Sequence, residues 1–306
     1  MPLDYNQITA ITNKKWIPKL YDNIFDSDPL LQRLKKKCYL KKDGGTVIMI
    51  PLNYALNGAG GWYTGAETFN TTDTENITAA AYDWKQLYEN ISITGRDREL
   101  NNGDAAILDF VKSKTQIAEK TMIDRLGDGI YSDGTDAKSI VGLGDIVDAT
   151  ETVGGLSGST YSWWAAQENS STTTLSMSGL QTMHTTLSKN NDGPTVAMAT
   201  RTLYNSYYAL LQPQQRFQDS ETAKGGFTSL MFNGIPFIAG SKVPSSHVMF
   251  LNEQYLHLVV HKNRDMKFTG FKEPVNQDVT VGQILWMGAL CTSNRRMQGK
   301  FTALAS

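Results

Sequence analysis

One stretch of the sequence, residues 46–131, constrains the fold more than any other. A β-prone run at residues 46–51 leads into residues 53–80, which hold four glycines, six threonines and few aliphatic side chains. An alternating segment follows at residues 82–94, and a helical pattern at residues 104–131. The glycine-rich segment cannot bury a core of its own, and an isolated hairpin is only marginally stable. The pattern therefore predicts either a disordered surface loop or a long two-stranded loop that partner subunits order.

The helical pattern predicts one long amphipathic helix. Asp104 follows Asn102-Gly103 and is a suitable N-cap. We expect Gly127 and Gly129 to end the helix, because glycine favours helix C-termini. About 25 residues at 1.5 Å per residue give a rod of about 40 Å. The apolar residues follow three- and four-residue spacing, as expected of a helix with one buried face: Ile107, Phe110, Val111, Ile117, Ala118, Met122 and Leu126.

The rest of the chain mixes helices and strands. We expect helices at residues 175–187 and 201–211, with Pro213 stopping the second, and a β-hairpin around Asn233-Gly234. The order of strand, long helix, mixed elements and strands indicates an α+β architecture rather than a doubly wound sheet. Further strands are expected at residues 195–199, 247–251, 256–261, 266–271, 283–291 and 297–304.

Composition permits a large core but shows one charge asymmetry. The 306 residues are 40% hydrophobic and carry a formal net charge of −1, which argues against a protein coated in basic residues for nucleic acid. The first fifty residues differ, because they hold nine basic side chains against five acidic ones. The run Lys35 to Lys37 is either a solvated charged face or part of an arm that meets a polyanion or an acidic neighbour.

Two widely spaced cysteines, Cys38 and Cys291, do not make a disulfide framework, and we expect both thiols to be free. Residues 1–20 are polar and lack the apolar region of a signal peptide. No apolar run reaches the roughly 20 residues that span a bilayer. We therefore expect a cytoplasmic setting and no membrane contact.

Catalytic motifs occur only as near misses. The run Gly155-Leu-Ser-Gly-Ser lacks the last glycine of a nucleophile elbow, and Gly142-Leu-Gly lacks the third glycine of a dinucleotide fingerprint. His257 and His261 flank a strand-like Leu-Val-Val run, where four residues span about 13 Å, too far for one metal ion. We expect no catalytic residues, no cofactor and no metal, and hence no enzyme.

A series of short motifs along nearly the whole chain resembles one family. The sequence is similar to the major capsid proteins of tailed bacteriophages, which have the Hong Kong 97-type fold. No single motif is diagnostic; the order and spacing of all of them carry the resemblance. They are WIPKLY at 16–21, IMIPL at 48–52, GWYTGAE at 61–67, YDWK at 82–85, ITGR at 93–96, YSDGT at 131–135, IVGL at 140–143, GGLS at 154–157, Trp163-Trp164 and residues 227–236.

The resemblance implies a role for each segment. Residues 1–45 would form an N-terminal arm and residues 46–94 an extended loop with flanking strands. Residues 95–140 would form the peripheral domain with its spine helix, and residues 141–265 the axial domain. Residues 266–306 would supply strands that return to the peripheral domain. Identical subunits would assemble into hexamers and pentamers of an icosahedral head that encloses double-stranded DNA.

The same resemblance implies partners and candidate contact residues. A portal, a separate scaffolding protein and a decoration protein are expected partners of a virion protein that assembles in the host cytoplasm. In the extended loop, the subunit-interface candidates are Trp62, Tyr63, Glu67 and Phe69, since aromatic residues dominate interface energies. An inner-face basic arm would make weak, salt-sensitive contacts with DNA or pair with acidic groups of a neighbour; its residues are Lys35, Lys36, Lys37, Lys41 and Lys42.

Three other classes of protein remain as alternatives. An encapsulin-like nanocompartment shell shares the fold but would enclose an enzyme cargo rather than DNA. A secreted adhesin-type binding module is suggested by the threonine and glycine content, but it would need an export signal. An enzyme would need a pocket in which titratable groups converge.

Some members of the resembled family join subunits by isopeptide bonds from a lysine in the extended loop. This chain has no lysine between Asp43 and Lys85. We therefore predict that assembled particles run as monomers on denaturing gels, with and without reductant. A ladder of bands under both conditions would contradict the prediction.

Overall fold

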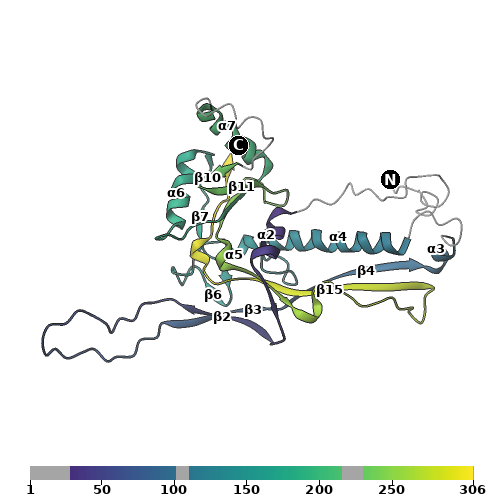
Figure 1. The fold of residues 1–306 in the computed structure, drawn as a ribbon, viewed down its shortest axis with the longest axis horizontal. Helices are drawn as coiled ribbons and strands as arrows, with labels where there is room; N and C mark the ends of the chain where they lie inside the picture. Colours follow the sequence, from purple (N-terminus) through teal and green to yellow (C-terminus); the bar gives the residue numbers. More distant parts are fainter. Residues whose placement is uncertain (1–27, 101–109, 216–229, 306) are drawn as a thin grey trace.

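The computed structural model of the chain describes residues 28–100, 110–215 and 230–305. The molecule is elongated (Figure 1): a long helix and two long strands run side by side, and a compact part stands beside one end of them. Residues 54–76, which contain no helix or strand, project from the same end of the molecule as the compact part, away from the long helix, and are called the extended loop below.

A five-stranded sheet is built around β15 (Val279–Thr292). On one edge, all ten residues of β4 (Lys85–Thr94) pair antiparallel with β15. On the other edge, β15 pairs with β13 (Leu256–His261) and β14 (Lys267–Phe268). Beyond β13, strand β1 (Tyr39–Lys42) adds a parallel neighbour. The two long strands therefore form the extended two-stranded strip seen in Figure 1.

Helix α4 (Phe110–Ile130) packs along β4 and β15. Its buried line is Ala118, Met122, Leu126 and Ile130, at four-residue spacing. The predicted face was partly wrong, because Val111 and Ile117 are each 39% exposed. Ile117 lies about 100° around the helix from the buried line. The expected N-cap, Asp104, lies outside the described residues.

The helix does not end at the two glycines, as the sequence suggested, but continues through both. Their lack of a side chain permits close packing instead. A Cβ at Gly129 would lie 3.2 Å from Cγ1 of Ile140, and one at Gly127 would lie 3.1 Å from Cδ of Lys242. Tertiary contacts thus outweigh the local preference of glycine for a helix end.

A six-stranded sheet forms the compact part, in the order β10, β11, β9, β12, β16, β7. Every residue of the two central strands β9 and β12 is buried, and β9 lies within the strand expected at residues 195–199. The Asn233-Gly234 hairpin is confirmed, with φ of 46° and 79° at the two turn residues. The strands are β7 (Gln167–Asn169), β9 (Val196–Ala199), β10 (Met231–Phe232), β11 (Ile235–Ala239), β12 (Val248–Leu251) and β16 (Gly299–Phe301).

Two helices pack on this sheet. Helix α6 (Met177–Leu187) is capped by Ser176, whose hydroxyl accepts a hydrogen bond from the amide of Gly179 at 3.2 Å. Helix α7 (Arg201–Gln215) continues through Pro213, so the predicted stop at this proline was wrong. Proline removes one helical donor, but the helix ends only two residues later, and its buried side chains Leu203 and Tyr207 lie before it.

Sheet membership crosses the segment boundaries expected from the sequence. Strand β13, within residues 141–265, belongs to the five-stranded sheet, whereas β16, within residues 266–306, belongs to the six-stranded one. Strand pairing joins residues far apart in sequence, so local patterns do not reveal it. Further short elements are α3 (Gly95–Leu100), α5 (Leu143–Ile146), and the short pairs β5 (Thr152–Val153) with β6 (Leu156–Ser157) and β8 (Thr173–Thr174) with β17 (Leu304–Ala305).

The extended loop projects from an antiparallel hairpin of β2 (Val47–Asn53) and β3 (Ile77–Asp83). The segment 82–94, expected to be one strand, is therefore two strands that separate at Trp84. The chain changes partner there, from β2 to β15. The hydroxyl of Tyr82 donates to the carbonyl of Thr292 at 2.9 Å, which fastens the hairpin to the end of β15.

We predict that Met122→Ala lowers the free energy of unfolding by about 2–5 kcal/mol, because the side chain is fully buried and its removal leaves a cavity. Ile117→Ala on the same helix is the matched control, with an expected loss below about 1 kcal/mol. Urea denaturation followed by circular dichroism measures both. Equal losses would mean that α4 packs through another face.

Candidate subunit interface

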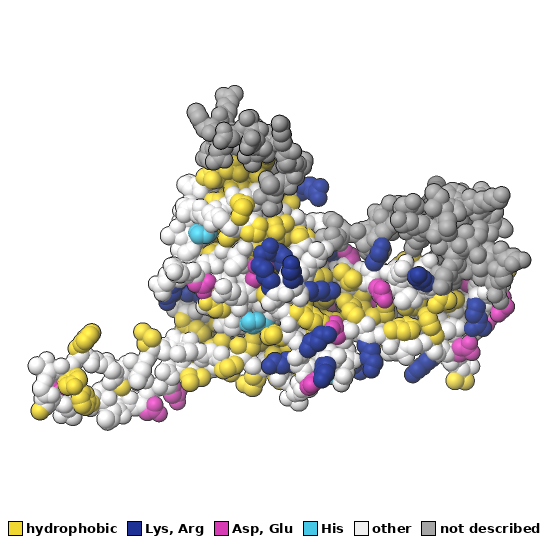
Figure 2. Space-filling model, in the orientation of Figure 1, with side chains coloured by type: hydrophobic (Ala, Val, Ile, Leu, Met, Phe, Trp, Pro, Cys, Tyr) yellow, Lys and Arg dark blue, Asp and Glu magenta, His cyan; other side chains and the backbone are white. Residues whose placement is uncertain are grey.

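The extended loop exposes large apolar side chains. Leu56 is 92% exposed and Trp62 is fully exposed. An exposed apolar side chain does not stabilise the isolated fold, and contiguous exposed apolar groups mark interaction sites. Figure 2 shows hydrophobic side chains gathered on the projecting loop, at the left of the view, away from the body of the molecule.

The four interface candidates from the sequence all lie on this exposed loop. Tyr63 and Phe69 are each 63% exposed, and their rings meet edge to face with centroids 5.1 Å apart. Glu67 is exposed between them in sequence. Trp62 makes no ring contact with the described residues. The structure thus brings two of the four side chains together and leaves the others pointing to solvent.

A second exposed apolar surface, which the sequence analysis missed, lies on the β2–β3 hairpin. Met49 is 65% exposed and Ile77 is 72% exposed, on the face opposite the buried Ile48, Leu52 and Tyr82. A signal existed: β2 reads Val-Ile-Met-Ile-Pro-Leu-Asn, apolar at nearly every position. Strands covered on both faces have continuous apolar runs rather than alternating ones. The hairpin and the loop together offer an uncovered apolar surface.

The basic arm begins with helix α2 (Pro29–Lys37). Asp28 caps it, because its carboxylate accepts hydrogen bonds from the amides of Leu30 and Leu31 at 3.2 and 3.3 Å. The hydroxyl of Tyr131, just after α4, also donates to Asp28 at 3.3 Å. Burial raises the pKa of Asp28, although these hydrogen bonds oppose the shift. The leucines of this helix are buried: Leu30, Leu31 and Leu34.

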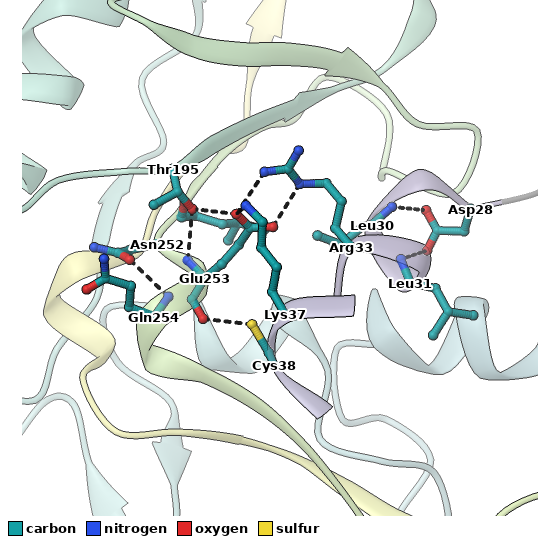
Figure 3. Close-up of polar contacts among 11 residues, drawn as sticks. Asp28, Leu30, Leu31, Arg33, Lys37, Cys38, Thr195, Asn252, Glu253 and Gln254 are labelled. Atoms are coloured by element: carbon teal, nitrogen blue, oxygen red, sulfur yellow. Dashed lines mark hydrogen bonds and ion pairs between the residues drawn. The ribbon is translucent and has the colours of Figure 1, made fainter. Parts of the chain in front are cut away.

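Glu253 fastens this helix to the body (Figure 3). Both carboxylate oxygens accept from Arg33, each at 2.8 Å, and one also accepts from Lys37 at 2.9 Å. Thr195 donates to the same carboxylate at 2.9 Å, and the thiol of Cys38 donates to the Glu253 carbonyl at 2.9 Å. Burial favours the neutral acid, but the donated hydrogen bonds outweigh it and hold the pKa of Glu253 below its usual value.

The five lysines of the predicted basic arm have different surroundings. Lys37 pairs with Glu253, and Lys41 pairs with Asp265 at 2.8 Å. The exposed side chains of Lys36 and Lys42 form no ion pair with the described residues. Part of the arm's charge is therefore neutralised within the chain. Lys35, also exposed, lies on the same helix.

Buried charge also organises residues 143–151. The guanidinium of Arg295 is fully buried and donates to the backbone carbonyls of Ile146, Glu151, Asp145 and Asp148 at 2.7–3.0 Å. The ammonium group of Lys300 donates a hydrogen bond to the Asp148 carboxylate at 2.9 Å. Although burial opposes it, hydrogen bonds from Thr150 and Lys300 hold the pKa of Asp148 well below its usual range. These distant pairings left no local signal in the sequence.

The cysteines and two of the histidines lie within the packed fold. Cys38 and Cys291 are free, as expected, and both are buried, which raises their pKa values to about 11 and about 12. His257 and His261 lie on β13, which confirms the expected strand. Among the described residues, no three His, Cys, Asp or Glu side chains gather as metal ligands. None of the helices in those same residues combines the length and apolarity needed to span a bilayer.

Three solved structures share the architecture. The capsid of cyanophage A-1(L) superposes with a TM-score of 0.76 at 16% identity, over 97% of this chain and 98% of that one. The capsid of the native GTA particle gives 0.67 at 10% identity, over 95% and 96%. The SrpI encapsulin of Synechococcus elongatus gives 0.64 at 9% identity, over 97% and 94%.

No protein-family model and no curated protein matches the chain, so the likeness rests on structure alone. At these low identities the likeness is one of fold. The chain has the α+β Hong Kong 97-type capsid fold over nearly its whole length. The fold predicted from the sequence, and its resemblance to phage capsid proteins, are confirmed.

We predict that Glu253→Gln lowers the free energy of unfolding by about 1.5–3 kcal/mol at neutral pH, because Arg33 and Lys37 then donate to a neutral group. Glu273→Gln is the control, since Glu273 meets Arg98 at the surface at 3.3 Å with 69% of its side chain exposed. Loss of the Glu273 charge should lower the free energy of unfolding by less than about 1 kcal/mol.

The effect of Glu253 should depend on pH. Its folded-state pKa lies below the ordinary value of 4.5, so its contribution is fully present above pH 4.5 and is lost as the pH falls through the lower folded-state value. Denaturation curves between pH 7 and pH 3 should therefore show wild type and Glu253→Gln converging at low pH. A difference that stays constant over this range would contradict the assignment.

Proposed function

We propose that the protein is a structural capsid subunit that assembles with identical copies into the hexamers and pentamers of an icosahedral phage head. The observation that carries this proposal is the extended loop, which leaves the body and exposes Trp62, Tyr63 and Phe69. The shared fold with phage capsid structures supports it. The role requires no catalytic residue and no cofactor.

Each segment then has a place in the shell. Residues 1–45 are the arm, residues 46–94 the extended loop with its strands, and residues 95–140 the peripheral domain with its spine helix. Residues 141–265 form the axial domain, and residues 266–306 return to the peripheral domain. In this proposed division, β13 of the axial segment lies in the five-stranded sheet and β16 of the returning segment lies in the six-stranded sheet.

The energetics of a loop-mediated contact suit a ring. A loop that lies on the next subunit makes a head-to-tail contact, and such contacts close into rings when the rotation closes. Burying one aromatic side chain contributes about 1.5–3 kcal/mol. Every subunit in a ring donates one loop and receives another, so this gain is repeated around the capsomer. Glu67 adds a charge that a neighbour can recognise.

The packaged double-stranded DNA is the proposed inner partner. Lys35, Lys36 and Lys42 supply the exposed positive charge of the arm, with Lys37 and Lys41 engaged with acidic groups of the chain itself. Such contacts are sequence-independent and weaken as salt rises. A portal, a separate scaffolding protein and a decoration protein are further proposed partners. Assembly would take place in the host cytoplasm, and the protein would reside in the virion.

A second candidate function is that of a nanocompartment shell. The likeness to an encapsulin structure at a TM-score of 0.64 favours it. The two functions differ in what the particle encloses. Nuclease-protected DNA inside particles isolated from the native source supports the phage head, whereas a protein cargo without nucleic acid supports the nanocompartment.

We predict that replacing the three loop aromatics, Trp62→Ser, Tyr63→Ser and Phe69→Ser, abolishes assembly while the melting temperature of the subunit stays within about 2 °C of wild type. The side chains are exposed, so the isolated fold does not depend on them. Size-exclusion chromatography with light scattering and negative-stain microscopy measure assembly.

The matched control is Val275→Ser, a fully exposed apolar residue outside the loop, which should assemble as wild type does. Normal shells from the triple variant would contradict the role of the loop. A wild-type protein that stays monomeric, even when co-expressed with a scaffold, would overturn the proposed function itself.

A further inference from the structure

The neck of the extended loop is closed by a single tyrosine. The amide of Tyr54 donates to the carbonyl of Asn76 at 3.0 Å, and its hydroxyl donates to the carbonyl of Glu75 at 2.8 Å. Tyr54 therefore joins the outgoing and returning strands just beyond the last pair of the hairpin, Asn53 with Ile77.

The ring of Tyr54 also contacts the body. It stacks on Trp163 with centroids 5.3 Å apart and an angle of 24° between the planes. Among the described residues, the hydrogen bonds and ring contacts of residues 55–74 join loop residues to one another: Asn57 with Ala59 and Thr74, Asn70 with Thr72, and Tyr63 with Phe69. Among these two kinds of interaction, the stack is thus the outermost one that a described loop side chain makes with the body.

Trp163 packs against a buried and hydrogen-bonded neighbour. Its ring lies 5.8 Å from that of Trp164, which is 1% exposed and donates from Nε1 to the carbonyl of Val153 at 3.1 Å. The Arg295 guanidinium lies 5.9 Å from the Trp164 ring centroid, held by its four carbonyl bonds. The path from Tyr54 to the buried core is therefore a continuous series of packed rings and hydrogen bonds.

The loop base has room to move without this contact. A cavity of about 520 Å³ borders both rings and is lined on the body side by Tyr255, Asn294 and Met297. About 11 residues separate the neck from the tip, which at most ~3.3 Å per residue gives a lever of roughly 36 Å. A rotation of about 10° at the neck would then displace the tip by roughly 6 Å.

We propose that the Tyr54–Trp163 stack is the positioning contact that sets the direction in which the extended loop leaves the body. A second part of the proposal rests on the proposed function: the direction of the loop determines the size and uniformity of the assembled shell. Trp163 acts through the loop rather than by touching a partner. Loss of the stack frees the loop without unfolding the body.

The direction of the loop is measured by electron spin distance spectroscopy between labels at Thr64→Cys in the loop and Thr185→Cys on α6, both exposed positions. The native thiols are buried, and labelled subunits are diluted with unlabelled ones so that only distances within a chain count. The doubly labelled protein with Tyr54 and Trp163 unchanged should give one narrow distance distribution. In Trp163→Leu the distribution should broaden or shift by about 6 Å or more.

Three further variants isolate the stack. Tyr54→Leu removes the same contact from the loop side and tests it even if Trp163→Leu folds poorly. Tyr54→Phe keeps the ring, loses the hydrogen bond to Glu75, and should retain the narrow distribution. Tyr161→Leu is the matched control. The ring of Tyr161 also packs near Trp163, with ring centroids 6.0 Å apart, but Tyr161 does not belong to the loop. A distribution unchanged in Trp163→Leu and Tyr54→Leu, or already broad in wild type, would overturn the proposal.

Particle diameters measured by electron microscopy test the second part. Trp163→Leu and Tyr54→Leu should give shells of mixed diameter or tubes, and Tyr161→Leu uniform shells. Uniform shells from a variant whose loop has lost its direction would overturn the link to shell size while leaving the capsid function intact. If wild type itself forms no shells, the capsid function fails, yet the distance measurement still decides whether the stack directs the loop.

Discussion

The antiparallel ladder between β4 and β15 is the interaction on which the rest of the molecule depends. Its ten paired residues bring together two parts of the chain that are far apart in sequence. Helix α4 packs on the strip through Met122 and Leu126, and the end of β15 receives the hydrogen bond from Tyr82 that fastens the hairpin. The extended loop is therefore connected, through the hairpin, to the end of the long strand β15.

Buried charges connect this strip to the six-stranded sheet. Glu253 follows β12 of one sheet and precedes β13 of the other, and its carboxylate accepts from Arg33 on α2 and from Thr195 beside β9. A buried carboxylate without partners would cost several kcal/mol. The helix and both sheets must therefore be in place together. The proposed role in a closed shell would need such a fixed relation, because the angle between neighbouring subunits follows from the shape of each body.

Local patterns predicted those elements whose geometry is local. The Asn233-Gly234 turn, helix α6 and the buried strand β9 each followed from a few neighbouring residues. The end of α4 did not, because Ile140 and Lys242 pack against Gly129 and Gly127 from elsewhere in the chain. Likewise, the composition of residues 53–80 predicted a segment without a core of its own, and the family resemblance supplied its aromatic residues as contact candidates. The contacts of Arg295 and Glu253 could not be predicted, since the side-chain hydrogen-bond partners of these two residues lie 58 or more positions away in the sequence.

The exposed surface of the loop and the fixed neck below it depend on each other. Trp62 gains nothing from the isolated fold, so its contribution is realised only when another molecule covers it. A freely moving loop would have to give up its orientational freedom at that moment, and the cost would reduce the gain. A stack of Tyr54 on Trp163 restricts the base in advance and leaves the tip free to adapt. Placing the rigid contact at the base and the apolar surface at the tip therefore favours binding in one direction, as an assembly of identical subunits requires.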